Sequence, residues 1–147
     1  MKIFKLRNVK TPTRGTPLSA GIDFYIPDDF PGVHSLMPGD DVNIPSGIKV
    51  KIPHGYALIF KNKSGVALNR GLQVGACIVD EDYQGEVHLH VRNIGLDVQF
   101  LEPGEKLVQA ILVPVLIEDV EVVDHISDLF EEETERGEGG FGSTGTK

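Results

Sequence analysis

The stretch "IVDEDYQGE" (78–86) places Asp80 and Asp82 two positions apart, with Tyr83 beside them. On an extended chain, residues at i and i+2 point to the same side. Such a pair can share a divalent cation, or one carboxylate can act as a general base on a water while hydrogen bonds hold the other. The competing interpretation is an ordinary acidic surface turn, which an isolated Asp-x-Asp pair usually is.

A second group of candidate residues lies in "KNKSGVA" (61–67), where Lys61 and Lys63 precede a turn of small residues. We expect a helix of about two turns in "SGVALNRG", with Ser64 as its N-cap and Gly71 as its terminator. The free backbone N–H groups and the Ser64 hydroxyl can receive an anion there. Taken alone, this pattern is weak.

Three further motifs favour simpler interpretations. His88 and His90 have a spacing that metal sites use, but no third ligand is evident nearby, so we interpret them as solvated residues on the polar face of a strand. Cys77, in the apolar "ACIV", is interpreted as a small core residue because no activating partner can be named. The tail "GFGSTGTK" lacks the spacing of a Walker phosphate loop.

Length and charge bound the function. The chain has 147 residues, of which 40% are hydrophobic, and this fits one core. Its net charge is -8, and ten of its 22 acidic residues lie between Glu118 and Glu138. Most of this surface would repel DNA or RNA, so no nucleic acid polymer is expected as a partner, whereas a small anion held by a few cations remains possible.

The expected location is the cytoplasm. Cys77 is the only cysteine, so no intrachain disulfide can form, and no cluster of zinc ligands is present. The opening "MKIFKLRNVK" has no apolar segment typical of a signal peptide, and no run approaches the roughly 18 to 20 apolar residues of a membrane span. A soluble intracellular protein without a membrane partner is the default expectation.

Period-two alternation predicts an all-β fold. In "GIKVKIP", Ile48, Val50 and Ile52 share one face, and "GEVHLHVRN" repeats the pattern with Val87, Leu89 and Val91. Turn signals separate such segments at the short spacing of a sandwich or barrel, at Pro31-Gly32, Pro38-Gly39, His54-Gly55 and Pro103-Gly104.

Two C-terminal segments need a different explanation. "EKLVQAILVPVLI" (105–117) is apolar on both faces, as expected of a strand that meets its own core on one side and a neighbouring subunit on the other. "EEETERGEGGFGSTGTK" (131–147) begins with charges that repel one another and ends in glycine. We expect an oligomer whose tail is a mobile arm, although composition alone favours a frayed terminus.

The order of these pieces resembles the five motifs of the homotrimeric deoxyuridine triphosphatase family. The matching stretches are "SAGIDF" (19–24), "KSGVA" (63–67), "VGACIVDEDYQGEV" (74–87), "GEKLVQ" (104–109) and "RGEGGFGSTG" (136–145). The resemblance implies a jelly-roll-like β-barrel or sandwich with one short helix. It further implies a homotrimer with shared active sites, a core over 1–130 and a flexible arm over 131–147 that closes over bound nucleotide.

The resemblance also implies a reaction, the hydrolysis of dUTP to dUMP and pyrophosphate with Mg²⁺. Asp80 matches the carboxylate that activates the water attacking the α-phosphorus. Tyr83 matches the ring beneath the deoxyribose, and Gly75, Cys77 and Val79 belong to the hairpin over about 75–91 whose backbone reads uracil, on which Phe141 stacks. The matched phosphate contacts are Lys63, Ser64, Gly65, Gln109, Arg136, Gly142, Ser143 and Thr144. Asp23 matches the carboxylate near the phosphates and metal, acting through water.

Two residues depart from the family pattern, and three other functions stay open. The second motif usually reads Pro-Arg-Ser but is Asn62-Lys63-Ser64 here, and Cys77 replaces a common glycine. Lysine keeps the charge but loses the bidentate fork of arginine. The alternatives are a dCTP deaminase of the same fold, a dUTP-binding regulator that signals through a partner, and a structural trimer without catalysis.

Overall fold

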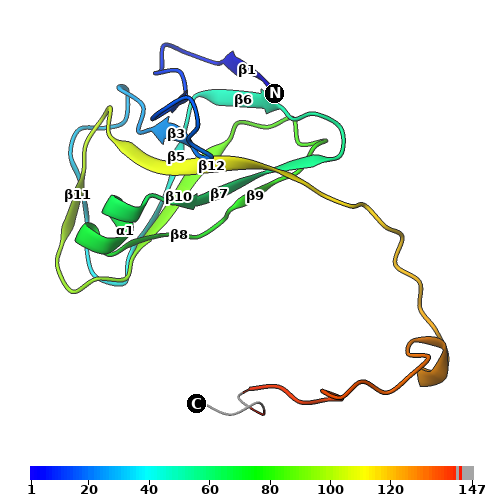
Figure 1. The fold of residues 1–147 in the computed structure, drawn as a ribbon. Coiled ribbons are helices and arrows are strands. Elements are labelled where there is room, and N and C mark those ends of the chain that lie inside the picture. Colours follow the sequence, from blue (N-terminus) through cyan, green and yellow to red (C-terminus); the bar gives the residue numbers. More distant parts are fainter. Residues whose placement is uncertain (142, 144–147) are drawn as a thin grey trace. The chain divides into compact units, whose positions relative to one another are not determined.

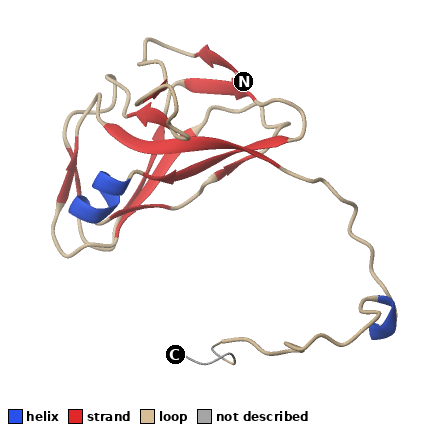
Figure 2. Ribbon diagram, in the orientation of Figure 1, coloured by secondary structure: helices blue, strands red, loops and turns tan. Residues whose placement is uncertain are grey.

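The computed structural model describes residues 1–141 and 143 of the chain. The chain forms two units, Met1–Leu116 and Ile117–Lys147, and each is described by itself. The first unit contains all the strands found among the described residues, together with a single α-helix (Figures 1 and 2).

The strands are short, and every strand pairing is antiparallel. They are β1 (Lys2–Lys5), β2 (Thr13–Arg14), β3 (Ile22–Tyr25), β4 (His34–Leu36), β5 (Asp41–Pro45), β6 (Ile48–Lys51), β7 (Tyr56–Asn62), β8 (Leu72–Val74), β9 (Ile78–Val79), β10 (His88–Asn93), β11 (Gln99–Leu101) and β12 (Lys106–Pro114). The predicted all-β class is confirmed.

These strands form four sheets. The largest has the order β2-β3-β12-β7-β9, and a second has the order β5-β10-β8. Two pairs, β1-β6 and β4-β11, complete the unit. Strands that are distant in sequence therefore lie side by side, and the ends of β3, β7 and β12 meet in one place.

The predicted alternation places the core residues correctly. Ile48 and Val50 of β6 are buried while Lys49 and Lys51 between and after them are exposed, as predicted. Phe24 and Phe60 pack edge to face, with their ring centroids 4.9 Å apart. The other fully buried large side chains come from most of the strands and their ends: Ile26, Leu36, Ile44, Ile52, Leu58, Leu72, Val87, Leu89, Leu101 and Leu107.

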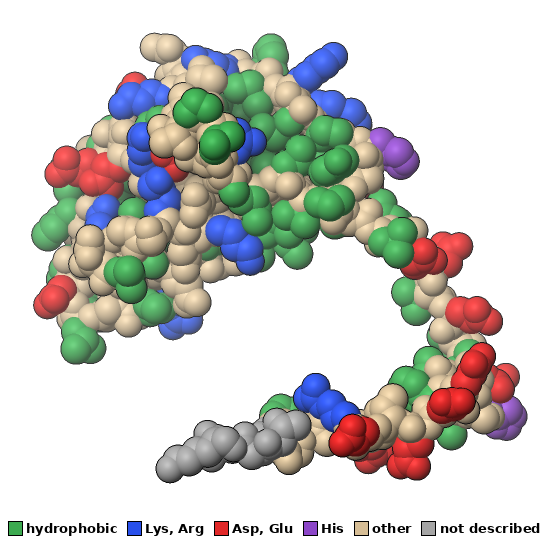
Figure 3. Space-filling model, in the orientation of Figure 1, with side chains coloured by type: hydrophobic (Ala, Val, Ile, Leu, Met, Phe, Trp, Pro, Cys, Tyr) green, Lys and Arg blue, Asp and Glu red, His purple; other side chains and the backbone are tan. Residues whose placement is uncertain are grey.

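Strand β12 is apolar on both faces, as predicted for residues up to Pro114. Val108 and Ala110 are buried in the core, whereas Ile111 and Val113 remain partly exposed on the outer face of the sheet. Apolar side chains gather over this part of the molecule in Figure 3. The outer face therefore has apolar surface that the single chain leaves partly uncovered, and the neighbouring subunit stays a prediction.

Helix α1 (Ser64–Arg70) is present where expected, but Ser64 is not its N-cap. Lys63 is the last residue with extended dihedrals, at φ -82° and ψ 130°, so Ser64 is already helical and no side chain caps this end. Gly71 does terminate the helix: it adopts φ 62°, and its N–H donates to the Ala67 carbonyl.

The second unit has little regular structure. Among its described residues it contains one short 3₁₀ turn, Ile126–Asp128, followed by irregular chain and turns (Figure 2). Across the described part of the chain, none of the helices has the length and apolar character that crossing a membrane requires.

Candidate active site

Two predicted site residues, Asp23 and Gln109, meet where β3, β12 and β7 lie side by side. Gln109 of β12 is paired with Asp23 of β3 on one side and with Lys61 of β7 on the other. Residues directly opposite in an antiparallel pair project from the same face of a sheet. The sheet register thus brings together residues that are distant in the sequence.

Asp23 holds two lysines at this place. Its side chain is buried, with 5% of the residue exposed, and it forms an ion pair with Lys63 through Oδ1. Lys106 Nζ lies 3.1 Å from its other oxygen, Oδ2. Burial alone would raise the pKa of Asp23, but hydrogen bonds and charge from the two ammonium groups outweigh burial and hold the pKa below its usual value. Asp23 is therefore ionised and fixes the position of Lys63.

Asn62 links this lysine cluster to the next strand. Its carbonyl oxygen accepts a hydrogen bond from Gln109 Nε2 at 2.8 Å, and its side-chain Oδ1 accepts the Val74 N–H at 2.7 Å. The family pattern that this chain resembles has a proline at this position, and a proline side chain could not accept a hydrogen bond. The departure at Asn62 therefore adds a contact between β7 and β8.

A hollow of about 280 Å³ brings together four other predicted residues, namely Cys77, Val79, Asp80 and Tyr83. Phe60, Val87 and the polar Asn43, Glu86 and His88 also line it, together with Ala76 and Ile78. Strand β9 forms one wall, since Val79 pairs with Leu58 of β7. Cys77 is half-buried at this wall and packs against the core, in agreement with its predicted small-residue role.

The chain around Asp80 is a turn, so the extended geometry assumed for Asp80 and Asp82 is wrong. The Tyr83 N–H donates to the Asp80 carbonyl at 3.2 Å, and this closes residues 80–83. Asp80 lines the hollow and is exposed, whereas Asp82 is an exposed residue of the turn. Asp80 alone of this pair thus faces the space where a water and a substrate could meet.

Tyr83 is fixed by the residues that follow it. Its hydroxyl donates to the Glu86 carbonyl at 2.9 Å, so the side chain folds back over Gly85. A Cβ atom on Gly85 would overlap the Tyr83 hydroxyl and ring. The glycine of "DYQG" is therefore required for this close approach, which sets the ring against the hollow.

Glu81 anchors the same turn to the β6–β7 connection, a role that the sequence did not indicate. Its carboxylate accepts the Gly55 N–H at 2.8 Å, and the His54 ring lies 3.0 Å away. The hydrogen bond from Gly55, with help from His54, lowers the pKa of Glu81. The alternation of charged residues in "DED" gave no signal for this contact, because its partners are 26 and 27 positions away.

Glu86 provides a second anchor that the sequence did not reveal. Its Oε1 accepts hydrogen bonds from Arg7 Nη1 at 2.8 Å and from the Gly47 N–H at 2.6 Å. Burial would raise the pKa of Glu86, but these two hydrogen bonds outweigh it and the pKa is lowered. The residue whose carbonyl holds Tyr83 is thereby fixed to the N-terminal segment.

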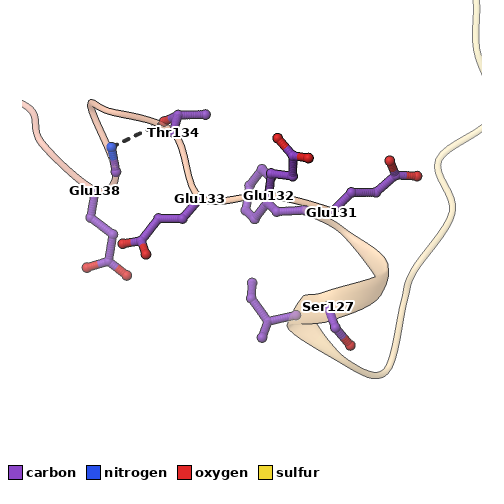
Figure 4. A pocket seen from close by; sticks show the side chains of 9 residues that line it. Ser127, Glu131, Glu132, Glu133, Thr134 and Glu138 are labelled. Carbon is purple, nitrogen blue, oxygen red and sulfur yellow. Dashed lines mark hydrogen bonds between the residues drawn. The ribbon is translucent and has the colours of Figure 1, made fainter.

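The predicted residues of the C-terminal arm belong to the second unit. Arg136 donates through Nε to the Gly139 carbonyl at 2.8 Å. The Gly137 N–H donates to Thr134 Oγ1 at 3.2 Å, the dashed line in Figure 4. Phe141 is fully exposed and Ser143 is exposed as well. Gly142 and Thr144 lie outside the described residues. Ser64 and Gly65 stay in the first unit, in the opening turn of α1.

A larger hollow, of about 740 Å³, is unsuited to an anion. It lies within the second unit and is lined by Glu131, Glu132, Glu133 and Glu138, with apolar contributions from Ile126 and Phe130 (Figure 4). The many acidic side chains of this unit are visible in Figure 3. A triphosphate would be repelled by this lining, so the better candidate site is the smaller hollow beside Asp80.

Metal binding at this site depends on ligands from the substrate phosphates. Among the described residues, no three His, Cys, Asp or Glu side chains cluster as a metal site would require. Both oxygens of Asp23 already contact lysine ammonium groups, so this arrangement suits a metal contact through water better than direct ligation. Mg²⁺ commonly keeps several waters and binds mainly through substrate phosphates.

Comparison with known proteins points to one family. The model of the dUTPase family matches residues 7–145. A deoxyuridine 5'-triphosphate nucleotidohydrolase of Anaplasma marginale is 34% identical, over 99% of this chain and 98% of that protein. The protein of the same name from Chlamydia caviae is 39% identical, over 77% of each chain.

Solved structures with the same fold include phage dUTPases. The dUTPase of Staphylococcus bacteriophage 80alpha, a mutant solved with dUpNHpp, has a TM-score of 0.82 at 22% identity and covers 99% of this chain and 98% of its own. A mutant dUTPase from phage phi11 of S. aureus, described with a structural Mg(II) ion, has a TM-score of 0.73 at 19% identity, over 86% and 97% of the two chains.

Proposed function

The chain belongs to the dUTPase family, and on this basis we propose that it hydrolyses dUTP to dUMP and pyrophosphate. The observation that carries the proposal is the hollow in which Asp80 lies beside Tyr83 and the uracil-side residues Cys77 and Val79. At about 280 Å³ it suits one nucleoside better than a polymer.

The pyrimidine and the sugar occupy this hollow. The backbone around Gly75, Cys77 and Val79 contacts the uracil edge through groups other than the Gly75 N–H and the Cys77 carbonyl, which pair with His90 and Phe60. Tyr83 supports the deoxyribose. The ring of Tyr83 is held through its hydroxyl by Glu86, so it cannot easily move aside for a 2′-hydroxyl. A rigid wall of this kind rejects a larger sugar by steric overlap.

The phosphates lie toward the cluster of Asp23, Lys63 and Gln109. Lys63 supplies positive charge, and its ion pair with buried Asp23 fixes that charge before substrate arrives. Ser64 and Gly65 add backbone donors from the first turn of α1, which has no intrahelical partners for them. In the arm, Arg136 and the segment of Gly142, Ser143 and Thr144 are proposed to contact the same phosphates.

The chemical step is a single displacement. Asp80 accepts a proton from a water, the water oxygen attacks the α-phosphorus, and the bond from that phosphorus to the pyrophosphate oxygen breaks. No covalent intermediate with the chain is needed. The Tyr83-to-Asp80 backbone hydrogen bond and the Glu81 anchor hold the turn, so that the Asp80 carboxylate stays in one position relative to the bound nucleotide.

Mg²⁺ bound to the triphosphate would neutralise its charge and orient it, as the ion does generally in phosphoryl transfer. The residue of this chain placed to act on such an ion is Asp23, through water. Its own charge is balanced by Lys63 and Lys106, which keeps the cluster from competing for the ion directly.

We further propose that three chains share their sites. The partly exposed Ile111 and Val113 on the outer face of β12 supply apolar surface for a neighbouring subunit. The arm, taken as residues 131–147, closes over a nucleotide with Phe141 stacked on uracil. A cytoplasmic location fits such an enzyme, because its nucleotide substrate is intracellular.

Turnover in ¹⁸O-labelled water tests this function. The expected products are dUMP and pyrophosphate, formed with Mg²⁺ and much less after its removal, with ¹⁸O in the dUMP. Label in pyrophosphate would mean attack at the β-phosphorus and would contradict the mechanism. The absence of dUTP turnover, or deamination of dCTP, would overturn the proposed function.

A further inference from the structure

Three successive backbone N–H groups, those of Val74, Gly75 and Ala76, are all held by hydrogen bonds, and we call this stretch the 74–76 segment. Val74 donates to Asn62 Oδ1 at 2.7 Å and Gly75 donates to the His90 carbonyl at 3.0 Å. Ala76 donates to the side chain of His90, at Nδ1, over 2.8 Å. Two of the three acceptors are therefore side chains outside the regular strand ladder.

The His90 ring packs directly on this backbone. A Cβ atom on Gly75 would overlap Nδ1 and the neighbouring ring carbon, so the glycine is what lets the ring approach. The His90 side chain is only 27% exposed, in contrast to the prediction of a solvated residue, whereas His88 on the same strand is exposed.

The contacts of His90 specify one tautomer. A backbone N–H can only donate, so Nδ1 must carry a lone pair toward Ala76. The other ring nitrogen, Nε2, lies 3.0 Å from Asp41 Oδ2 on β5, and a carboxylate can only accept. The arrangement is thus satisfied by a neutral imidazole with its proton on Nε2, oriented by Asp41.

The held segment leads directly into the hollow, where Ala76 and Cys77 form part of the lining. We propose that His90 is a positioning residue for pyrimidine selection: its Nδ1 fixes the Ala76 amide, and thereby the backbone that reads the base. This inference rests on the proposed function, in which backbone groups near Gly75 and Cys77 contact uracil. His90 itself contacts backbone and Asp41, and it has no part in the chemistry at Asp80.

Two substitutions of His90 test the contacts of its two ring nitrogens separately. In His90→Asn the amide oxygen can take the place of Nδ1 and accept from Ala76, while the Asp41 contact is lost. In His90→Gln the longer side chain can reach Asp41 from the place of Nε2, but no acceptor remains at Nδ1. His34→Asn, which changes a histidine packed on Phe30, controls for the loss of an imidazole elsewhere.

Steady-state kinetics with dUTP and dTTP give the first readout. Loss of one hydrogen bond to the reading backbone should raise KM for dUTP about ten-fold in His90→Gln and lower the preference for dUTP over dTTP. The turnover number should change little, and His90→Asn should stay close to wild type. A wild-type KM in His90→Gln, or a fall in turnover number alone, would overturn the positioning role.

A second readout does not depend on turnover. In nucleotide-free wild-type protein, ¹⁵N spectra of His90 should show an unprotonated Nδ1 and a protonated Nε2, and the Ala76 amide should exchange slowly. His90→Gln should lose that protection, and equal exchange in both proteins would overturn the inference even if dUTP is hydrolysed. If the wild-type protein protects the Ala76 amide but does not turn over dUTP, the proposed function fails. The affinity for dUpNHpp then takes the place of KM as the readout. Equal affinity in wild type and His90→Gln would overturn the positioning role.

Discussion

The hydrogen bonds of the hollow and those of the arm differ in the distance they span along the chain. Around the hollow, Arg7 reaches Glu86, Asn62 reaches Val74 and Glu81 reaches Gly55, so each contact joins separate elements. In the arm, the contacts of Arg136 with Gly139 and of Gly137 with Thr134 span three residues each.

This difference indicates when the hollow and the arm each become ordered. Long-range contacts are supported by a shared core and exist before substrate binds. Local turns contribute little free energy, and ordering a segment with many glycines costs much conformational entropy. We therefore expect the hollow to be formed in the free protein, and the arm to take its working conformation only when nucleotide supplies contacts.

Removing the base should have the largest effect. Asp80→Asn keeps the shape of the turn but cannot accept the proton of the attacking water, so turnover should fall about 10³-fold. Binding of dUpNHpp and the melting temperature should stay close to wild type, because the Asp80 side chain is exposed. Asp82→Asn is the matched control and should retain activity; near-wild-type turnover in Asp80→Asn would move the chemistry elsewhere.

Deleting residues 136–147 should have the next largest effect. Turnover of dUTP should fall about 10²-fold, since the arm contributes positioning and exclusion of water. The melting temperature should not change, because none of the described residues in this segment belongs to a strand. Full activity of the shortened chain, measured beside intact protein, would reduce the arm to a frayed terminus.

Mixing two inactive variants tests whether the arm acts between chains. Asp80→Asn chains supply an intact arm, and chains lacking 136–147 supply an intact Asp80. If sites are shared, mixed oligomers should recover part of the activity that neither variant has alone. Subunit exchange is verified by native mass spectrometry, and no recovery in verified mixtures would contradict a shared site.

Substitution of Lys63 should have a moderate effect on the kinetics of dUTP turnover. Lys63→Ala removes one cation from the phosphate side and should raise KM or lower kcat/KM about ten-fold. Lys63→Arg is the matched variant, because it restores the arginine of the family pattern and keeps the contact with Asp23 within reach. If Lys63→Ala retains wild-type kinetics, Lys61 or Arg136 supplies the charge instead.

The smallest expected effect is that of Asp23→Asn on the free energy of unfolding, and it depends on pH. The pKa of Asp23 is lowered in the folded chain, so its ion pairs stabilise the fold above the unfolded value near 3.8 and stop doing so as pH falls through the lower folded value. Asp23→Asn should cost about 1 kcal/mol at neutral pH, discounted for the partly exposed lysines. Urea unfolding should show this difference shrinking below about pH 4; a constant difference would contradict the ion-pair explanation.

Local pattern was sufficient to predict much of the fold. The alternation in β6 and β10 predicted which residues are buried, and Gly71 marked the end of α1. The Ser64 cap was wrong because the helix begins one residue earlier than a cap at Ser64 requires, and sequence does not determine dihedrals at that precision.

The site was predictable only where its residues lie in recognisable motifs. Asp80, Tyr83 and Lys63 were predicted in this way; the structure places Asp80 and Tyr83 at the hollow and Lys63 against Asp23, and their roles stay predictions. Glu81, Glu86 and His90 were missed because their roles arise from partners more than ten positions away, which the strand register creates. A charged or aromatic residue on a strand carries no sequence signal for such a partner.

Hydrogen exchange with and without dUpNHpp and Mg²⁺ tests most directly whether the hollow is formed in advance and the arm is ordered by nucleotide. Peptides covering 74–93 should be protected in both states, since their amides are held by Asn62 and His90 and by strand pairing. Peptides covering 131–147 should exchange rapidly in the free protein and become protected only when nucleotide binds. An arm already protected without nucleotide, or a 74–93 region that gains its protection only on binding, would contradict this account.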